Sequence, residues 1–288
     1  MTAKLISAAL FILLAPVVGG FMSGLDRVIS ARMQKRKGPP VWQAFYDVFK
    51  LFSKETFVVN KIQDFFAFGF FLFIVFTGVL FFVGGDLLLI IFSLTLASIF
   101  LVMCASSTSS PYSAMGAQRE LFQMMSYEPM ILIIAVGFYM ATGSFNVQDI
   151  VGKDSPAIIF LPAIFLGYIF ILIIKLRKSP FDLSTSHHAH QEMVKGLTTE
   201  FSGKMLAVIE VAHWYENVML FGIVALFFIT TQWWSWLVAF GVVSLVFVFE
   251  ILIDNADARV KWQDMLKSSW IIALIFGILN LIIIKNIT

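Results

Sequence analysis

The sequence has few of the residues that a water-soluble protein places on its surface. Only 13% of its 288 residues are charged, whereas 59% are hydrophobic, and the mean hydropathy is +0.90. A soluble chain carries about 25% charged residues. The composition therefore excludes soluble enzymes, nucleic-acid-binding proteins and disordered scaffolds.

Cysteine is almost absent and proline is scarce. The single cysteine, Cys104, excludes an internal disulfide and any iron–sulfur cluster or thiolate zinc site held by this chain alone. Eight prolines and 32 phenylalanines indicate apolar helices, because the strands of an outer-membrane barrel must alternate apolar with polar residues. We expect an all-α polytopic membrane protein with a single integral membrane domain over residues 1–288.

Eight apolar segments are candidates to cross about 30 Å of hydrocarbon, which takes about 20 helical residues. The first one lacks an A-x-A cleavage signature and is interpreted as an anchor rather than a signal peptide. The eight segments are residues 5–22, 65–83, 87–105, 114–142, 158–175, 206–230, 233–253 and 270–284.

The basic residues are distributed unevenly between the two ends of these spans. Of the 20 Lys and Arg residues, 17 lie in or next to four loops, residues 24–64, 106–119, 176–205 and 254–269. Cytoplasmic loops carry the excess of Lys and Arg. The pattern predicts a multi-pass protein of the cell membrane, with these loops in the cytoplasm and both termini outside.

The first of these loops combines a basic run with an aromatic pattern. DRVISARMQKRKGPP contains Arg32, Arg36 and Lys37, and the segment after it repeats Trp, Phe, Phe and Phe at helical spacing, which predicts an amphipathic helix at the membrane interface. The basic run either fixes topology and contacts lipid head groups or binds another protein. The stiff Gly-Pro-Pro step after it favours a loop held against another surface.

Several acidic residues fall inside or near predicted spans, where a charged side chain costs about 2.5 to 3.5 kcal/mol. Such residues are candidates for an ion pathway, although local pairing with Arg119, Lys175 and Lys204 would explain them as packing contacts. The topology places them in the cytoplasmic half of the membrane. The candidates are Glu120, Glu128, Glu210, His213, Glu216, Glu250 and Asp254.

The loop at 176–205 holds three of the four histidines. His187, His188 and His190 are followed by Glu192 in the stretch STSHHAHQE. Imidazoles are common metal ligands, but this spacing does not match a known zinc motif and no thiolate supplements it. A role in hydrogen bonding or proton relay is the favoured interpretation, since the ordinary pKa of histidine is about 6.5.

Four sequence blocks, one in each predicted cytoplasmic loop, carry a family resemblance. They are DRVISARMQKRKGPP with AFYDVFKLFSKE, SAMGAQRELFQMMSYE, KSPFDL with EFSGK, and ARVKWQDMLKSSW. In this order they resemble the ND1 or H-subunit family of respiratory complex I, and most of all its branch in the Ech-type energy-converting nickel–iron hydrogenases. The resemblance implies eight transmembrane helices. Glu128 and Glu200 match glutamates of the family motifs, which makes Glu200 a further ion-translocation candidate.

Two departures favour the hydrogenase branch over a quinone-binding subunit. STSHHAHQE replaces the acidic run that follows PFDL in complex I, and His213 stands where complex I usually has glutamate. The first departure argues against quinone binding, and the second suggests a rewired proton route.

The resemblance implies a membrane subunit with no redox centre of its own. Its partners would be the hydrogenase large and small subunits, an iron–sulfur subunit, an antiporter-like membrane subunit and membrane lipid, with no nucleic acid. Iron–sulfur clusters and a nickel–iron centre would belong to those partners, and no metal to this chain. Ferredoxin-dependent hydrogen formation would be linked to proton or sodium movement. The docking surface would comprise Arg32, Arg36, Lys37, Asp182, His187, His188, His190 and Glu192. A quinone-site subunit of a complex I-type dehydrogenase and a free-standing ion transporter are the alternatives.

Overall fold

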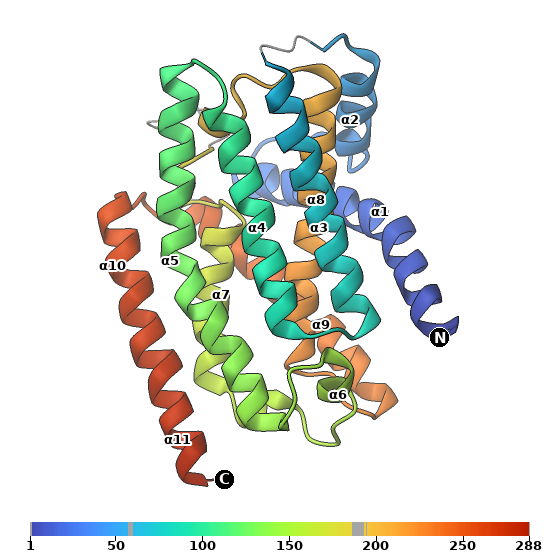
Figure 1. The fold of residues 1–288 in the computed structure, drawn as a ribbon, viewed down its shortest axis with the longest axis vertical. Coiled ribbons are helices and arrows are strands. Elements are labelled where there is room, and N and C mark those ends of the chain that lie inside the picture. Colours follow the sequence, from blue (N-terminus) through green and yellow to red (C-terminus); the bar gives the residue numbers. More distant parts are fainter. Residues whose placement is uncertain (1, 57–59, 186–192, 194, 288) are drawn as a thin grey trace.

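The computed structural model describes residues 2–56, 60–185, 193 and 195–287, and within these ranges it contains helices and no strand. The prediction of an all-α membrane protein is confirmed. The α-helices are α1 (Thr2–Met33), α2 (Gln43–Ser53), α3 (Lys61–Val83), α4 (Leu87–Ser106), α5 (Pro111–Thr142), α6 (Val147–Val151), α7 (Pro162–Lys175), α8 (Gly203–Leu226), α9 (Trp233–Ala256), α10 (Trp262–Ile272) and α11 (Leu279–Ile287). Figure 1 shows them as a bundle with α8 behind α3 and α4.

Local sequence signals set the ends of the spanning helices. The Asn60 side chain accepts a hydrogen bond from the backbone of Ile62 and starts α3, whereas Ser110 followed by Pro111 starts α5. Gly84 and Gly143 end α3 and α5 with φ of 85° and 77°, a left-handed conformation that favours glycine.

Seven helical segments of the described chain are long and apolar enough to cross a membrane. They correspond to seven of the eight predicted spans. The first, α1, continues past the predicted end at residue 22 to Met33, and the last, Trp262–Asn286, begins eight residues before the predicted start at residue 270. A π-helical stretch, Ala273–Ile278, joins α10 to α11 within that last span.

The remaining predicted span, residues 158–175, is shorter than the others. A 3₁₀ turn at Ala157–Ile159 precedes α7, which has Pro162 in its first turn and only 14 residues. Fourteen residues of helix are about 21 Å long, less than the bilayer core. The chain that follows α7 is irregular but buried, with Phe181 and Ser184 at 5% and 0% exposure. Irregular backbone is tolerated at membrane depth where protein surrounds it.

Helix α2 and the first turns of α3, α5 and α8 lie at one end of the bundle, opposite the C-terminus (Figure 1). This end, called the basic end below, holds parts of three of the four predicted cytoplasmic loops, those at residues 24–64, 106–119 and 176–205. Ala44 and Val48 of α2 pack against Ala207 and Trp214 of α8. Trp42, Phe49 and Phe52 remain exposed. The predicted amphipathic helix is therefore confirmed, and its position at the membrane interface stays a prediction.

Candidate functional site

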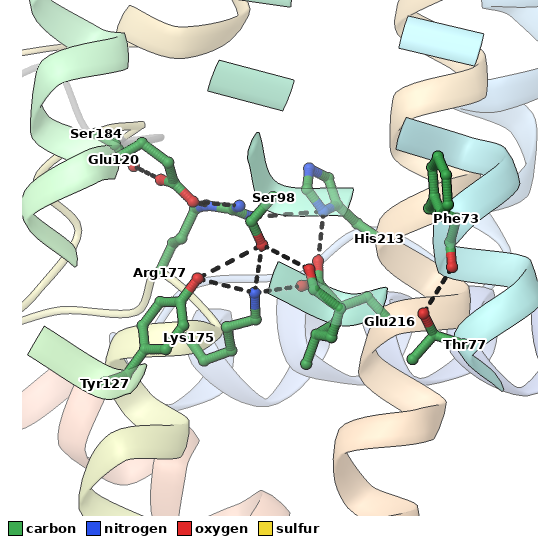
Figure 2. A network of polar contacts seen from close by, with 11 residues as sticks. Phe73, Thr77, Ser98, Glu120, Tyr127, Lys175, Arg177, Ser184, His213 and Glu216 are labelled. Carbon is green, nitrogen blue, oxygen red and sulfur yellow. Dashed lines mark hydrogen bonds and ion pairs between the residues drawn. The ribbon is translucent and has the colours of Figure 1, made fainter. Parts of the chain in front are cut away.

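A buried ion pair joins α7 to α8. Lys175 Nζ lies 3.0 Å from Glu216 Oε1, and both side chains are almost fully buried, at 2% and 3% exposure. Lys175 also donates to Ser98 Oγ at 2.8 Å and to Tyr127 Oη at 3.1 Å. Figure 2 shows these groups, from α4, α5, α7 and α8, converging on the ammonium. Two hydroxyl oxygens therefore accept hydrogen bonds from Lys175, and the Glu216 carboxylate balances its charge as the ion-pair partner.

A second buried ion pair lies beside the first. Arg177, two residues after α7, donates to both carboxylate oxygens of Glu120 on α5, with Nη2 at 2.6 Å from Oε1. Ser184 Oγ donates to the same carboxylate at 2.5 Å. Burial alone would lower the pKa of Arg177, but the adjacent Glu120 carboxylate outweighs it and raises that pKa, so the guanidinium stays charged.

His213 on α8 connects the two ion pairs. Its Nδ1 atom lies 3.1 Å from Glu216 Oε2 and 3.4 Å from Arg177 Nη1. Nδ1 donates to Glu216 when it carries a hydrogen, and accepts from Arg177 when it does not. The two contacts exclude one another as hydrogen bonds, so the proton position on His213 determines which pair the imidazole joins. The charge network, as named below, consists of Glu120, Arg177, Ser184, His213, Glu216, Lys175, Tyr127 and Ser98 (Figure 2).

The charge network borders a cavity of about 230 Å³, called the central cavity below. Its walls come from α1, α8, α9 and the irregular segment after α7. An ion pair between Lys178 Nζ and Asp26 Oδ2, 3.2 Å apart, lies in this wall. A space of this size holds several water molecules. The charged and histidine side chains in the wall are Asp26, Lys175, Arg177, Lys178, Asp182, Lys195, Glu210, His213, Glu216 and Asp254.

The structure brings some of the predicted acidic residues together and separates others. Glu120, His213 and Glu216 belong to the charge network, whereas Glu210 and Asp254 line the central cavity. Asp254 accepts a hydrogen bond from the backbone N–H of Ser179 at 2.8 Å.

Glu250, Glu128 and Glu200 lie apart from that arrangement. Glu250 is fully buried in α9. Glu128 faces a hollow of about 70 Å³ between α4 and α5, next to Thr95. Glu200 lies in a turn before α8, where its backbone carbonyl accepts a 3.4 Å hydrogen bond from Gln63. No single chain of contacts therefore joins all the predicted ion-translocation residues within the described part of the protein.

The predicted docking residues fall into three groups. Arg32, Arg36 and Lys37 are exposed at the basic end and surround a surface hollow of about 400 Å³ with Pro39 and Pro40. Asp182 is only 5% exposed and faces the central cavity instead of the outer surface. His187, His188, His190 and Glu192 lie outside the described residues.

Sequence reasoning did not assign a role to Arg177, Lys178, Tyr127, Ser98 or Asp26. The run KLRKSP was the available signal, because three cations directly after an apolar span need acidic partners if the chain turns inward. Lys175 was considered only as a local packing partner, and the structure gives it that partner in Glu216.

The described residues offer no ligand set for a metal or a cluster. Within that part of the chain no three His, Cys, Asp or Glu side chains converge. Cys104 is buried and its Sγ donates to the backbone oxygen of Gln63 at 3.0 Å. The described side chains therefore do not fit the iron–sulfur clusters that the family resemblance implies for partner subunits.

Comparisons with known proteins agree on one family. The profile of the NADH dehydrogenase family matches residues 5–285. Hydrogenase-4 component C of Escherichia coli is 30% identical over 241 residues, which cover 77% of this chain and 74% of that protein. The H subunit of the NADH-quinone oxidoreductase of Carboxydothermus hydrogenoformans is 30% identical over 240 residues, covering 73% and 67%.

A solved structure has the same fold. A chain of the membrane-bound sulfane sulfur reductase, an archaeal respiratory membrane complex, superposes with a TM-score of 0.84 at 24% identity, over 96% of this chain and 99% of that one. Similar proteins of this fold are thus named as parts of complexes that act on different substrates.

Proposed function

This chain is a membrane subunit of the NADH dehydrogenase family, to which the H subunit of complex I belongs, and we propose that it docks a peripheral nickel–iron hydrogenase module and couples ferredoxin-dependent hydrogen formation to proton or sodium translocation. The similarity to hydrogenase-4 component C supports the hydrogenase branch. The proposed orientation has the basic end in the cytoplasm.

The path of the chain after α7 is the observation that carries the coupling role. The short helix ends inside the bundle, and the next residues place Arg177 against Glu120 and Lys178 against Asp26. The same segment continues through Pro180 to Ser184, which donates to Glu120. A partner that moves this loop would therefore move two buried cations relative to their acids, which changes the electrostatic energy of both ion pairs.

The contacts of His213 link the position of Arg177 to the position of a hydrogen atom on the imidazole. Movement of Arg177 away from the imidazole favours the tautomer that donates to Glu216, and approach of Arg177 favours the other. Lys175 holds Glu216 in place throughout. One hydrogen thus moves between Nδ1 and Nε2 of the imidazole in step with the position of the loop, with no net gain or loss of a proton.

Charge reversal tests the docking role. We expect Arg32→Glu, Arg36→Glu and Lys37→Glu together to release peripheral subunits from the purified complex while the membrane subunits stay assembled. The matched control is Lys50→Glu, Lys54→Glu and Lys61→Glu, which makes the same charge change at exposed positions of the same loop. Peripheral subunits that stay bound at physiological salt would contradict the docking role.

Ion uptake by sealed vesicles tests the coupling role. Glu128→Gln keeps the shape of the side chain but cannot exchange a proton, so we expect fewer ions moved per hydrogen formed with assembly intact. Glu55→Gln, a change of the same kind at an exposed position outside the spans, is the control. An unchanged ratio of ions to hydrogen would remove Glu128 from the pathway.

The clusters and the nickel–iron centre would be held by partner subunits, since this chain offers no ligands for them among its described residues. This chain's own contribution is to bind the peripheral module and to hold protons and charges at the network.

A quinone-site role is the second candidate, because of one observation. An apolar groove of about 810 Å³ between α1, α8 and α9 shares Met22, Phe221 and Phe247 with the central cavity. An amphiphile with a polar head and a long apolar tail fits that shape. Hydrogen formation from reduced ferredoxin without added quinone, insensitive to quinone-site inhibitors, would favour the hydrogenase role. Quinone-dependent, inhibitor-sensitive turnover would favour this second candidate.

A further inference from the structure

Glu250, near the C-terminal end of α9, is buried and has no hydrogen-bond partner among the described residues. It is 0% exposed, and within the described part of the chain neither carboxyl oxygen has a hydrogen-bond partner. The ion pair of Glu216 on α8 shows what an ionised carboxylate needs at such a place. An unpaired buried charge costs several kcal/mol, and such a group neutralises instead. The environment of Glu250 therefore favours the protonated acid.

Glu250 does not line the central cavity itself, but its neighbours on α9 do. Phe247 and Asp254 stand one turn to either side of it on the same stripe of α9, and both line the cavity. The ammonium of Lys178 lies 5.4 Å from the centre of the Phe247 ring. Lys178 and its partner Asp26 are also the two charged groups whose fields act on Glu250.

The other elements packed here supply no second cation among the described residues. From α8, Phe221 packs edge-on against Phe247 with ring centres 5.8 Å apart. From α7, Tyr168 donates its hydroxyl hydrogen to the backbone of Leu220 at 2.8 Å. Lys178, on a flexible stem of four carbons, is thus the cation within reach of Glu250 in this part of the chain.

The two acids near Lys178 differ in their access to solvent. The Asp26 side chain is 28% exposed and Lys178 is 12% exposed, whereas Glu250 is closed off. Asp26 can exchange its ion pair for water, but an ionised Glu250 needs the ammonium. Lys178 therefore pairs with Asp26 while Glu250 is neutral. When Glu250 loses its proton, pairing with Lys178 removes the cost of an unpaired buried carboxylate.

We propose that Glu250 is a proton-binding site of this chain, served from the central cavity by Lys178, which alternates between Asp26 and Glu250. In one step the O–H bond of Glu250 breaks and the proton passes to water of the cavity. The carboxylate that remains accepts the Lys178 ammonium, which keeps its own protons, while water solvates Asp26. Reloading reverses each move, and no electron is transferred.

As a proton-binding site this assignment stands apart from the hydrogenase role. As a station on an ion route it rests on the proposed coupling function. The experiment must therefore detect the proton itself rather than the turnover of the complex.

Infrared spectroscopy of the purified complex at neutral pH detects a protonated carboxyl group through its C=O band. We expect such a band in the wild type, its loss in Glu250→Gln, and its retention in Glu210→Gln, the matched control on the cavity wall. A spectrum of Glu250→Gln identical to that of the wild type in this region would overturn the proposal.

Transfer into D₂O tests the part played by Lys178. We expect Lys178→Gln to slow the deuterium shift of the Glu250 band about 100-fold, because exchange passes through the ionised carboxylate and this variant removes the cation that stabilises it. Lys195→Gln removes another cavity-lining cation, exposed at the surface, and should leave the rate unchanged. Asp26→Asn with Lys178→Gln removes both members of the ion pair, which avoids an orphaned charge, and should exchange as slowly as Lys178→Gln.

Wild-type exchange in both Lys178 variants would overturn the role of Lys178. A band that exchanges through Lys178 in a complex that moves no ions would support the proton-binding site and contradict the proposed coupling function.

Discussion

Two buried glutamates on neighbouring helices have opposite surroundings. Glu216 on α8 contacts Lys175 and His213, whereas Glu250 on α9 lacks a hydrogen-bond partner within the described chain. Both are almost fully removed from solvent. The same side chain at the same degree of burial is thus a fixed anion in one place and a neutral acid in the other.

The difference shows that partners, not burial, decide what a buried acid does. A paired acid stabilises the packing of α7 against α8 and holds His213 in register. An unpaired acid adds no such contact, but it can change its protonation state without breaking an ion pair. Variants that remove a partner or replace a glutamate test this comparison.

The largest effect is expected from Lys175→Met. It leaves Glu216 buried without its cation, which costs about 3 to 5 kcal/mol. We expect little of the chain in membranes and a clearly lower unfolding temperature of the purified complex. Lys175→Met combined with Glu216→Leu should restore much of the loss, because an apolar pair of similar volume replaces the ion pair. A single variant as stable as the wild type would mean that water already satisfies Glu216.

His213→Asn tests the alternation at Nδ1. The amide nitrogen of Asn can donate to Glu216 while its oxygen accepts from Arg177, so both contacts form at once and no proton needs to move. We expect normal assembly and coupled turnover reduced about 100-fold. Wild-type coupled turnover would indicate that His213 has only a packing role.

Glu250→Gln should have a small effect on stability, less than about 1 kcal/mol, because one neutral polar group replaces another. Glu216→Gln is its matched counterpart and should be far more harmful, since it orphans Lys175. Thermal unfolding of the two purified complexes measures the difference. Equal losses would show that Glu250 is ionised and paired, contrary to the comparison.

The smallest effect is expected at the exposed ion pair that ties α2 to α1. Arg27 lies 2.6 Å from Asp47, with both side chains about two-fifths exposed (43% and 41%). Burial acts to raise the pKa of Asp47, but hydrogen bonds from Arg27 and Gln43 outweigh it and hold the pKa below its ordinary value of 3.8. The resulting stabilisation is present above that ordinary pKa and is lost as pH falls through the lowered one.

Solvent screening limits the Arg27–Asp47 contribution to below about 1 kcal/mol. Asp47→Asn should therefore speed hydrogen exchange in α2 slightly at pH 7, and the difference from the wild type should shrink as the pH falls below the ordinary pKa of Asp47. A large difference at pH 7 would show that the Arg27–Asp47 pair contributes as much to stability as a buried ion pair, contrary to its exposure.

Most of the fold followed from the sequence, because the relevant signals are local. Apolar run length and low charge predicted the membrane class and located the spans, and the Trp and Phe spacing predicted α2. The end of α1 and the start of α10 were misplaced because the apolar run stops at the first polar residues, whereas both helices extend through exposed positions such as Arg32 and Asp264. The helix α7 was predicted within residues 158–175 but is shorter than expected, because Pro162 and the turn before it shorten the helix without interrupting the apolar run.

The sequence by itself determined which acids lie within or beside membrane spans, since that depends only on position in an apolar run. Tertiary structure alone decided their chemistry. Glu120 meets Arg177 across 57 positions, and Glu216 meets Lys175 from another helix. Glu250 meets no such partner among the described residues. These pairings depend on where a 14-residue helix ends and how deeply the next segment enters the bundle, and neither helical periodicity nor charge counting encodes that depth.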